Sequence, residues 1–467
     1  MKLIIQNTCT AALLMVLTVA AGAEESVVAY QEYMKFVREN LPEIRAARLE
    51  SMRSETGIKR SRAYADPRLS VGSRYQYDEP VSGRTIVNKR SGVDSYAGVS
   101  RTFGPTGTKL GVAAGYGAFD VQSETGDYAS YQPTVSLTLR QPVMKNFLGM
   151  IDRIDVKNSK LAYEIARIEE KVEIVSYEYT YSFAYMQWCA YMRLNSLSRN
   201  NVSNAWSLYR QTVRKMKAGV AENDDVQKSY SMFLRNRITQ NDNQKRYREF
   251  YYLIAELVSR EKIVPEYDAF EATYEKARNQ SYGMIPFQET RQFQTVQKTL
   301  ESYRLSHDSA ENAMLPQLDL TASVERWDDT DEFGRSLSEL DRSGFTVGFE
   351  LTYPLGNTEA EADFEYARLS LRQLSEELRK DVTDYYSKLR YTVDAVEKTK
   401  ETISLYEQTI RSLRSQYATE SRKYEQIRLP LSTLLETQQN LADAESSLVQ
   451  TKLDLVSLYY TYIQLTQ

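Results

Sequence analysis

The feature that most constrains this chain of 467 residues is a strand-and-helix pattern that occurs twice. Residues 130–141 alternate between apolar and polar side chains, which is the period of a β-strand with one apolar face. A Gln-Pro pair and a short glycine-containing turn follow, and no further proline occurs before Pro265. Residues 345–353 open the second copy, and after Pro354 no proline occurs before Pro430. Each strand therefore leads into a helix longer than those of ordinary globular domains.

The two copies align at a constant offset of 208 positions, which places Leu161 on Leu369 and Val226 on Leu434. A fixed offset over a long span indicates an internal duplication. Apolar residues also recur every seven positions in the long stretches, which puts them on one seam and predicts coiled-coil packing. They are Val396, Ile403, Ile410 and Tyr417 in one series and Leu434, Leu441, Leu448, Leu455 and Tyr462 in another.

As single helices, residues 155–218 and 361–427 would each be about 95–100 Å long. A break follows each of them, at residues 217–220 and 428–430, and the helical periodicity then resumes. Each half of the chain is therefore expected to hold a long helix-turn-helix hairpin.

Residues 1–23 have the features of a cleavable secretory signal, with an early lysine, an apolar run and an Ala-Gly-Ala site before Glu24. Its removal takes away Cys9 and leaves Cys189, which is expected to be a small buried residue without a disulfide partner. No other segment offers the roughly 20 apolar residues that a spanning helix needs. An exported chain of this kind enters a membrane only through its strands.

Residues 69–77 and 318–324 alternate in the same way, and residues 96–120 are typical of a β-hairpin around a turn with two glycines and a proline. One-sided strands in an exported protein fit a barrel with lipid outside and water inside. The matched strands number four per chain, or six with the hairpin, whereas a closed membrane barrel needs about eight. The chain must therefore oligomerise or keep its strands out of lipid.

The sequence contains no glycine-rich phosphate loop, no nucleophile elbow and no paired carboxylates in a compact domain. His307 is the only histidine, and without a second histidine or clustered cysteines it does not make a typical zinc site. We therefore expect no enzyme activity, no cofactor and no bound metal. With 59 basic and 63 acidic residues the net charge is −4, which argues against nucleic acid as a partner.

These patterns divide the chain into successive segments. They are a signal peptide (1–23), a first helix (24–66), a β region (67–142) with the extra hairpin (96–120), a long helical hairpin (143–260), a linker or equatorial segment (261–286), a helix (287–315), a second β region (316–354) and a second long helical hairpin (355–467).

Five short stretches mark strand boundaries and one hairpin tip. They are Gln141-Pro142, Leu315-Pro316-Gln317-Leu318, Tyr353-Pro354-Leu355-Gly356-Asn357, Lys217-Ala218-Gly219-Val220 and Asp225-Val226-Gln227. In their order and spacing, and in the duplicated helix–strand–strand–helix plan, the chain resembles the TolC-type outer-membrane efflux proteins, also called outer-membrane factors. The resemblance covers nearly all of the mature chain.

The resemblance implies a mixed, mainly α-helical fold whose strands form a shared transmembrane β-barrel in a homotrimer. The barrel would have twelve strands, or eighteen if the 96–120 hairpin joins it. The resemblance also implies a passive exit duct of a tripartite efflux or type I secretion system, placed in the outer membrane with a helical tube in the periplasm. Its partners would be further copies of itself, outer-membrane lipid, a periplasmic membrane-fusion adaptor and an inner-membrane pump of the RND, ABC or a similar class.

Five residues at the two hairpin tips are candidates for docking the adaptor: Lys217, Gly219, Val220, Arg428 and Pro430. A glycine lets the backbone of a partner approach, and the two cations would pair with acidic groups of the adaptor. The alternatives are that Gly219 is a helix C-cap with a positive φ and that the charges are only solvated. The second tip lacks the glycine that the family's pattern has at the first.

Six charged residues on the polar strand faces are expected to face a water-filled lumen, without forming a specific substrate site. They are Arg68, Arg74, Arg140, Asp319, Glu325 and Glu350.

Two other functions remain open at this point. One is a stand-alone outer-membrane channel or surface adhesin that works without a pump. The other is a soluble periplasmic coiled-coil scaffold, which explains the helices but gives no reason for strands with an apolar face.

Overall fold

A computed structural model describes residues 26–79, 87–336 and 340–467. The expected signal peptide, residues 1–23, lies outside the described residues. The described chain divides into two compact units, to both of which the longest helices contribute. The helical unit consists of residues 26–46, 172–290 and 384–467, and the sheet unit consists of residues 47–79, 87–171, 291–336 and 340–383.

The duplication expected from the sequence recurs in the bounds of the long helices. Helix α3 (Met150–Lys217) and helix α8 (Thr358–Glu425) have 68 residues each, and α4 (Asn223–Val258) and α9 (Leu431–Thr466) have 36 each. Corresponding ends differ by the same 208 positions that relate the two copies in the sequence. The mainly helical fold with a sheet is therefore confirmed.

None of the described helices combines the length and the apolar character that crossing a membrane requires.

The core of the helical unit gathers segments that are far apart in the chain. A short strand β1 (Ser26–Val28) pairs in parallel with β6 (Ile263–Pro265). Trp188 and Tyr185 of α3 are fully buried beside them. The Tyr185 hydroxyl donates to the carbonyl of Val28 at 2.5 Å, which ties α3 to the paired strands.

Most of the seven-residue repeats lie on buried faces of this unit. Val396, Ile403 and Ile410 of α8 are buried, and so are Leu434 and Leu455 of α9. The apolar seam is therefore the side of each helix that packs, as the period predicts.

The segment expected to be the first helix, residues 24–66, contains two helices that follow β1. Helix α1 (Tyr30–Asn40) has Leu41 as its C-cap. Helix α2 (Pro42–Arg62) begins with proline in its first turn, where the missing N–H costs nothing. Residues 261–286, expected to be a linker or equatorial segment, contain β6 and helix α5 (Tyr267–Asn279). The remaining short elements are η1 (Ala63–Ala65), η2 (Phe147–Gly149), η3 (Phe287–Glu289), α6 (Arg291–Ala313) and α7 (Phe333–Ser336).

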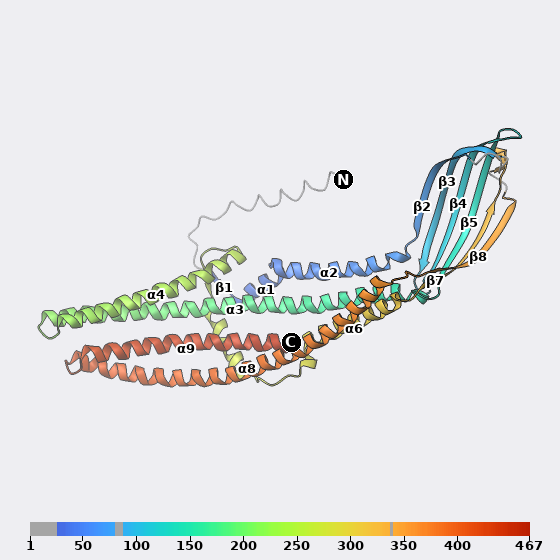
Figure 1. Cartoon of the computed structure of the whole chain (residues 1–467). Helices are drawn as coiled ribbons and strands as arrows, with labels where there is room; N and C mark the ends of the chain where they lie inside the picture. The colour runs from blue at the N-terminus through green and yellow to red at the C-terminus, as the bar shows by residue number, and fades with distance from the viewer. Residues whose placement is uncertain (1–25, 80–86, 337–339) are drawn as a thin grey trace, which may run out of the picture. The chain divides into compact units, whose positions relative to one another are not determined.

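The sheet unit carries six antiparallel strands in its described residues, side by side in the order β2-β3-β4-β5-β7-β8 (Figure 1). Their bounds are β2 (Arg68–Asp78), β3 (Val87–Phe103), β4 (Thr108–Ser123), β5 (Tyr128–Pro142), β7 (Gln317–Trp327) and β8 (Arg342–Thr352). The extra hairpin therefore belongs to the same sheet as the other four strands.

The hairpin is longer than the 96–120 segment expected from its alternation. Strand β3 begins at Val87 and pairs with β2 as far as Asp78 opposite Arg90. Residues 87–94 are rich in charged and small side chains, so their pairing partner, and not their own pattern, extends the strand.

Candidate functional site

The register of the six strands sorts their side chains onto two unlike faces. Leu69 lies opposite Val99, Val99 opposite Val112, and Val112 opposite Leu137, so apolar residues form a continuous face across four strands. Apolar residues of β7 and β8 continue this face, with Val324 opposite Phe345. In the single chain this face is exposed to solvent, with Phe345 81% exposed and Leu69 72% exposed. A contiguous exposed apolar face of this kind marks a surface that a membrane or a partner covers.

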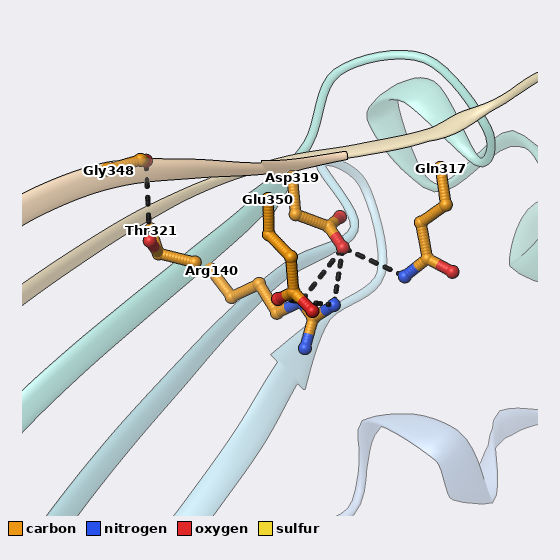
Figure 2. Close-up of polar contacts among 6 residues, drawn as sticks. All are labelled: Arg140, Gln317, Asp319, Thr321, Gly348 and Glu350. Carbon is orange, nitrogen blue, oxygen red and sulfur yellow. Dashed lines mark hydrogen bonds and ion pairs between the residues drawn. The ribbon is translucent and has the colours of Figure 1, made fainter. Parts of the chain in front are cut away.

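The other face is polar and carries all six residues that the sequence singled out. Figure 2 shows three of them together at the ends of β5, β7 and β8. Arg140 donates to one carboxylate oxygen of Asp319 from Nε at 2.9 Å and from Nη2 at 2.6 Å. The same Nη2 lies 3.4 Å from a carboxylate oxygen of Glu350. Gln317 donates to the same oxygen of Asp319 at 2.8 Å, so one oxygen of this buried carboxylate accepts three hydrogen bonds.

The other three polar-face residues lie apart from this cluster or at its margin. Arg74 of β2 is 3.3 Å from Asp94 of β3, a partner that the sequence did not indicate. Glu325 is exposed, and no ion pair involves it within the described part of the chain. Arg68, the first residue of β2, lines the same cavity as Arg140.

The first hairpin tip ends α3 with a left-handed glycine. Gly219 has φ +74°, its N–H donates to Met216, and the next N–H, of Val220, donates to Lys215. This pair of hydrogen bonds is a Schellman motif, so the C-cap role weighed for Gly219 is present in the structure. Lys217, Gly219 and Val220 are all exposed.

The second tip has the same backbone geometry without a glycine. Ile427 has φ +61°, its N–H donates to Tyr424, and the N–H of Arg428 donates to Lys423. Ile427 stands 208 positions after Gly219, which is the offset of the duplication. Arg428 and Pro430, the candidates chosen from the sequence at this tip, are both exposed. Ile427 was not among them, although the offset points to it.

Close to the tips, α3 and α8 are joined by a lysine and a tyrosine. The Lys215 amine donates to the carbonyl of Tyr424 and lies 3.6 Å from the centre of its ring. The Tyr424 hydroxyl is 3.1 Å from the Thr212 hydroxyl. Burial lowers the pKa of Lys215, and the aromatic face compensates part of its lost hydration.

Cys189 and His307 have side chains that can bind metals, and neither is part of the polar-face cluster or the hairpin tips. Cys189 is fully buried in the core of the helical unit, as expected, and burial raises the pKa of its thiol. The His307 ring of α6 lies 5.0 Å from the Phe364 ring at a tilted angle. Potential ligand atoms of His307, Asp308 and Glu311 lie within 4.8 Å of one another. His307 is half-buried and the two acids are exposed, and exposed acidic groups of this kind are common without an ion.

Residues 287–461 match the family model described as outer membrane efflux protein. Comparison with curated protein sequences gives no match.

Three solved structures of outer-membrane proteins have a similar fold over nearly the whole chain. The CmeC outer membrane channel of Campylobacter jejuni is 11% identical, with a TM-score of 0.66, and covers 96% of this chain and 90% of its own. VceC of Vibrio cholerae is 11% identical, with a TM-score of 0.66, and covers 94% of this chain and 96% of its own. The MtrE outer membrane channel of Neisseria gonorrhoeae is 14% identical, with a TM-score of 0.64, and covers 96% and 93% respectively.

The fold is therefore that of the outer-membrane channels. Together with the match over residues 287–461, it confirms the resemblance of this chain to the TolC-type outer membrane efflux protein family.

Proposed function

We propose that the chain is a passive exit duct of the outer membrane, built from three copies that share one β-barrel. The observation that carries this proposal is the one-sided sheet, whose apolar face is exposed. Its two edge strands, β2 and β8, each pair on one side only among the described residues. Open edges in lipid leave backbone groups unpaired at several kcal/mol each, so a spanning sheet has to close.

Closure through three copies pairs β8 of one copy with β2 of the next. Six strands per chain then give a barrel of eighteen strands, because the extra hairpin is part of the sheet. The apolar face would meet lipid, and the polar face with Arg68, Arg74, Arg140, Asp319, Glu325 and Glu350 would line the lumen. The helical unit would form a tube in the periplasm after cleavage of residues 1–23.

Planar-bilayer recording of the purified protein tests the duct directly. The proposal predicts stepwise ion conductance after insertion, because a wide water-filled lumen passes ions without an energy source. Protein that leaves membranes in high salt and gives no conductance would contradict the duct and favour a periplasmic scaffold.

The hairpin tips carry the second part of the proposal, the docking of a periplasmic adaptor that connects the duct to an inner-membrane pump. The supporting observations are that Lys217, Gly219 and Val220 are exposed at one tip and Arg428 and Pro430 at the other. A helix hairpin with two arrangements, one of which the adaptor binds better, would open the duct by a shift of population.

A photoreactive residue at Val220 tests docking better than one at Gly219, where the positive φ disfavours any side chain. Val220 is 44% exposed, and Leu405 of α8, which is 56% exposed, serves as the control position. We expect a crosslinked product in cells that mass spectrometry identifies as a periplasmic adaptor, at Val220 and not at Leu405. Conductance without any adaptor product would instead support a stand-alone channel.

A further inference from the structure

The polar face of the sheet ends in a cavity of about 420 Å³ that the proposed function leaves without a role. It lies within the sheet unit, between the ends of the strands and the segments next to η1 and η2. Its basic lining residues are Arg68, Arg101, Lys109, Arg140 and Lys145, and its acidic ones are Asp66, Asp152 and Asp319. The lining is therefore cationic by two charges.

Two of the three acidic groups of the lining accept hydrogen bonds from neighbouring side chains. Asp319 accepts from Arg140 and Gln317, as Figure 2 shows, and Asp152 accepts from the side-chain amide of Asn146 at 2.9 Å. In contrast, Arg68, Lys109 and Lys145 form no ion pair within residues 26–79, 87–336 and 340–467. These three cations therefore have no acidic side chain within ion-pair distance, and neither Asp66 nor Asp152 of the lining has a cationic partner among the described residues. The lining as a whole keeps its excess of two positive charges.

The strand register sharpens this imbalance at one position. Lys109 of β4 lies directly opposite Arg140 of β5. Like charges directly opposite each other on one face of a sheet are destabilising. Asp319 and Glu350, on β7 and β8, compensate the charge of Arg140. Lys109 has Thr102 opposite it on its other side, so the register gives it no acidic neighbour.

A second cavity, of about 300 Å³, adjoins the first and shares Lys109 and Arg140 with it. Its other polar side chains are hydroxyls, from Ser100, Thr138, Thr321, Ser323 and Thr346. Hydroxyls donate to anions, and an uncompensated ammonium beside a guanidinium is the complement of a charged oxygen group. Together, the two cations and these hydroxyls favour an oxyanion over a cation or an apolar solute.

We propose that Lys109, Arg68 and Arg140 form an oxyanion-binding site for small solutes that carry phosphate or carboxylate groups. The site belongs to the lumen if the polar face lines the duct, so its transport consequence rests on the proposed function. The duct then concentrates anionic solutes at this end of the sheet and passes anions more readily than cations. The volume suits a small molecule and not a folded macromolecule.

The binding test uses inorganic pyrophosphate as the probe and the full-length protein in an uncharged detergent, followed by titration calorimetry. Lys109→Gln and Arg68→Gln are expected to weaken binding by about tenfold each, the value of one charge-assisted hydrogen bond. Arg74→Gln is the matched control. Arg74 lies on the same strand and face as Arg68, but it pairs with Asp94 outside the cavity. Lys109→Arg keeps the charge and should retain binding.

Three results of this titration would overturn the site. They are no binding by the unchanged protein, an equal loss in the Arg74→Gln control, and unaltered binding by Lys109→Gln. Thermal melting of each variant shows that it is folded, and Lys109→Gln should melt no lower than the unchanged protein because it removes a like-charge pair. The same titration in nanodiscs distinguishes a solute from a lipid headgroup. Pyrophosphate binding that disappears when the nanodisc contains anionic lipid would assign the site to a lipid headgroup and contradict a solute site.

The transport consequence is measured separately, as the reversal potential across a bilayer with a potassium chloride gradient. We expect a potential of the sign for anion preference and a shift toward cation preference in Lys109→Gln. Channels with the same potential in both proteins would overturn the selectivity while leaving the duct intact. No conductance in any protein, with pyrophosphate binding retained, would contradict the duct and leave the site standing.

Discussion

Gly219 and Ile427 hold the same left-handed backbone conformation at equivalent positions of the two hairpin tips, with φ of +74° and +61°. For glycine this conformation is free of steric cost, whereas a β-branched residue is strained in it. Ile427 is also 63% exposed, so burial of its side chain does not compensate the strain.

Replacing Ile427 by glycine is therefore expected to stabilise the protein. Relief of the strained φ, less the added freedom of the unfolded chain, should raise the free energy of unfolding by about 1 kcal/mol. The measurement is the thermal unfolding midpoint in detergent, with Gly219→Ala as the control that should unfold at a lower temperature. A midpoint that stays the same or falls in Ile427→Gly would mean that the side chain makes a compensating contact in the assembly.

The Arg140–Asp319 pair is expected to behave as a coupled unit. Asp319 is 3% exposed, so Arg140→Gln leaves a buried carboxylate without its charged donor and should cost about 2 kcal/mol of unfolding free energy. Combining it with Asp319→Asn should restore part of that loss, which a double-mutant cycle of unfolding free energies measures. Additive losses would show that the two side chains stabilise the sheet independently.

Glu350, the second acidic neighbour of Arg140, should contribute much less to stability than Asp319. Glu350 has a side chain that is 58% exposed and lies 3.4 Å from Arg140. An exposed ion pair contributes about 0–1 kcal/mol, so Glu350→Gln should change the unfolding free energy far less than Arg140→Gln. Equal effects of the two substitutions would contradict the assignment of Asp319 as the main partner.

Cys189 should be chemically silent in the folded protein. The thiolate is the reactive form, and burial raises the pKa of this thiol while closing access to it. Treatment with N-ethylmaleimide at pH 8 should add no mass to Cys189 until the protein is denatured, whereas an engineered Leu405→Cys should react at once. Rapid labelling of Cys189 in folded protein would contradict this and would mean that the core of the helical unit opens transiently.

The extra hairpin offers a test of the strand count. The chain from Glu79 to Asp127 can be replaced by a four-residue turn, which joins β2 to β5 in antiparallel directions and keeps their apolar faces together. Barrel width grows with strand number, so the outer diameter seen by electron microscopy should fall to about two-thirds. An unchanged diameter would place the hairpin outside the barrel.

Periodicity explains which parts of this fold could be predicted from the sequence. The alternation around Val135 and Leu137 and the seven-residue series through Val396 depend only on neighbours along the chain, so they identified the strands and long helices. The duplication was visible because both copies keep the same spacing. Polar side chains such as Arg140 and Asp319 were placed on one face, but their hydrogen bonds depend on the register between β5 and β7.

The parts that were not predicted depend on long-range pairing or on backbone conformation. Strand β1 has three residues and acquires its structure by pairing with β6, some 237 positions away, as Ser26 opposite Ile263 shows. Lys109 was overlooked because the next six residues on its face of β4, at positions 111 to 121, are all small or apolar, so the strand carried no pattern of charge. Ile427 was overlooked because no local preference places isoleucine at a positive φ.

The central claim is that three chains share one barrel, and the mass of the protein in mild detergent tests it most directly. Light scattering with the detergent contribution subtracted should give three times the mass of the mature chain, because a sheet with two open edges closes only with other copies. A folded monomer of one chain mass would contradict the shared barrel and with it the duct.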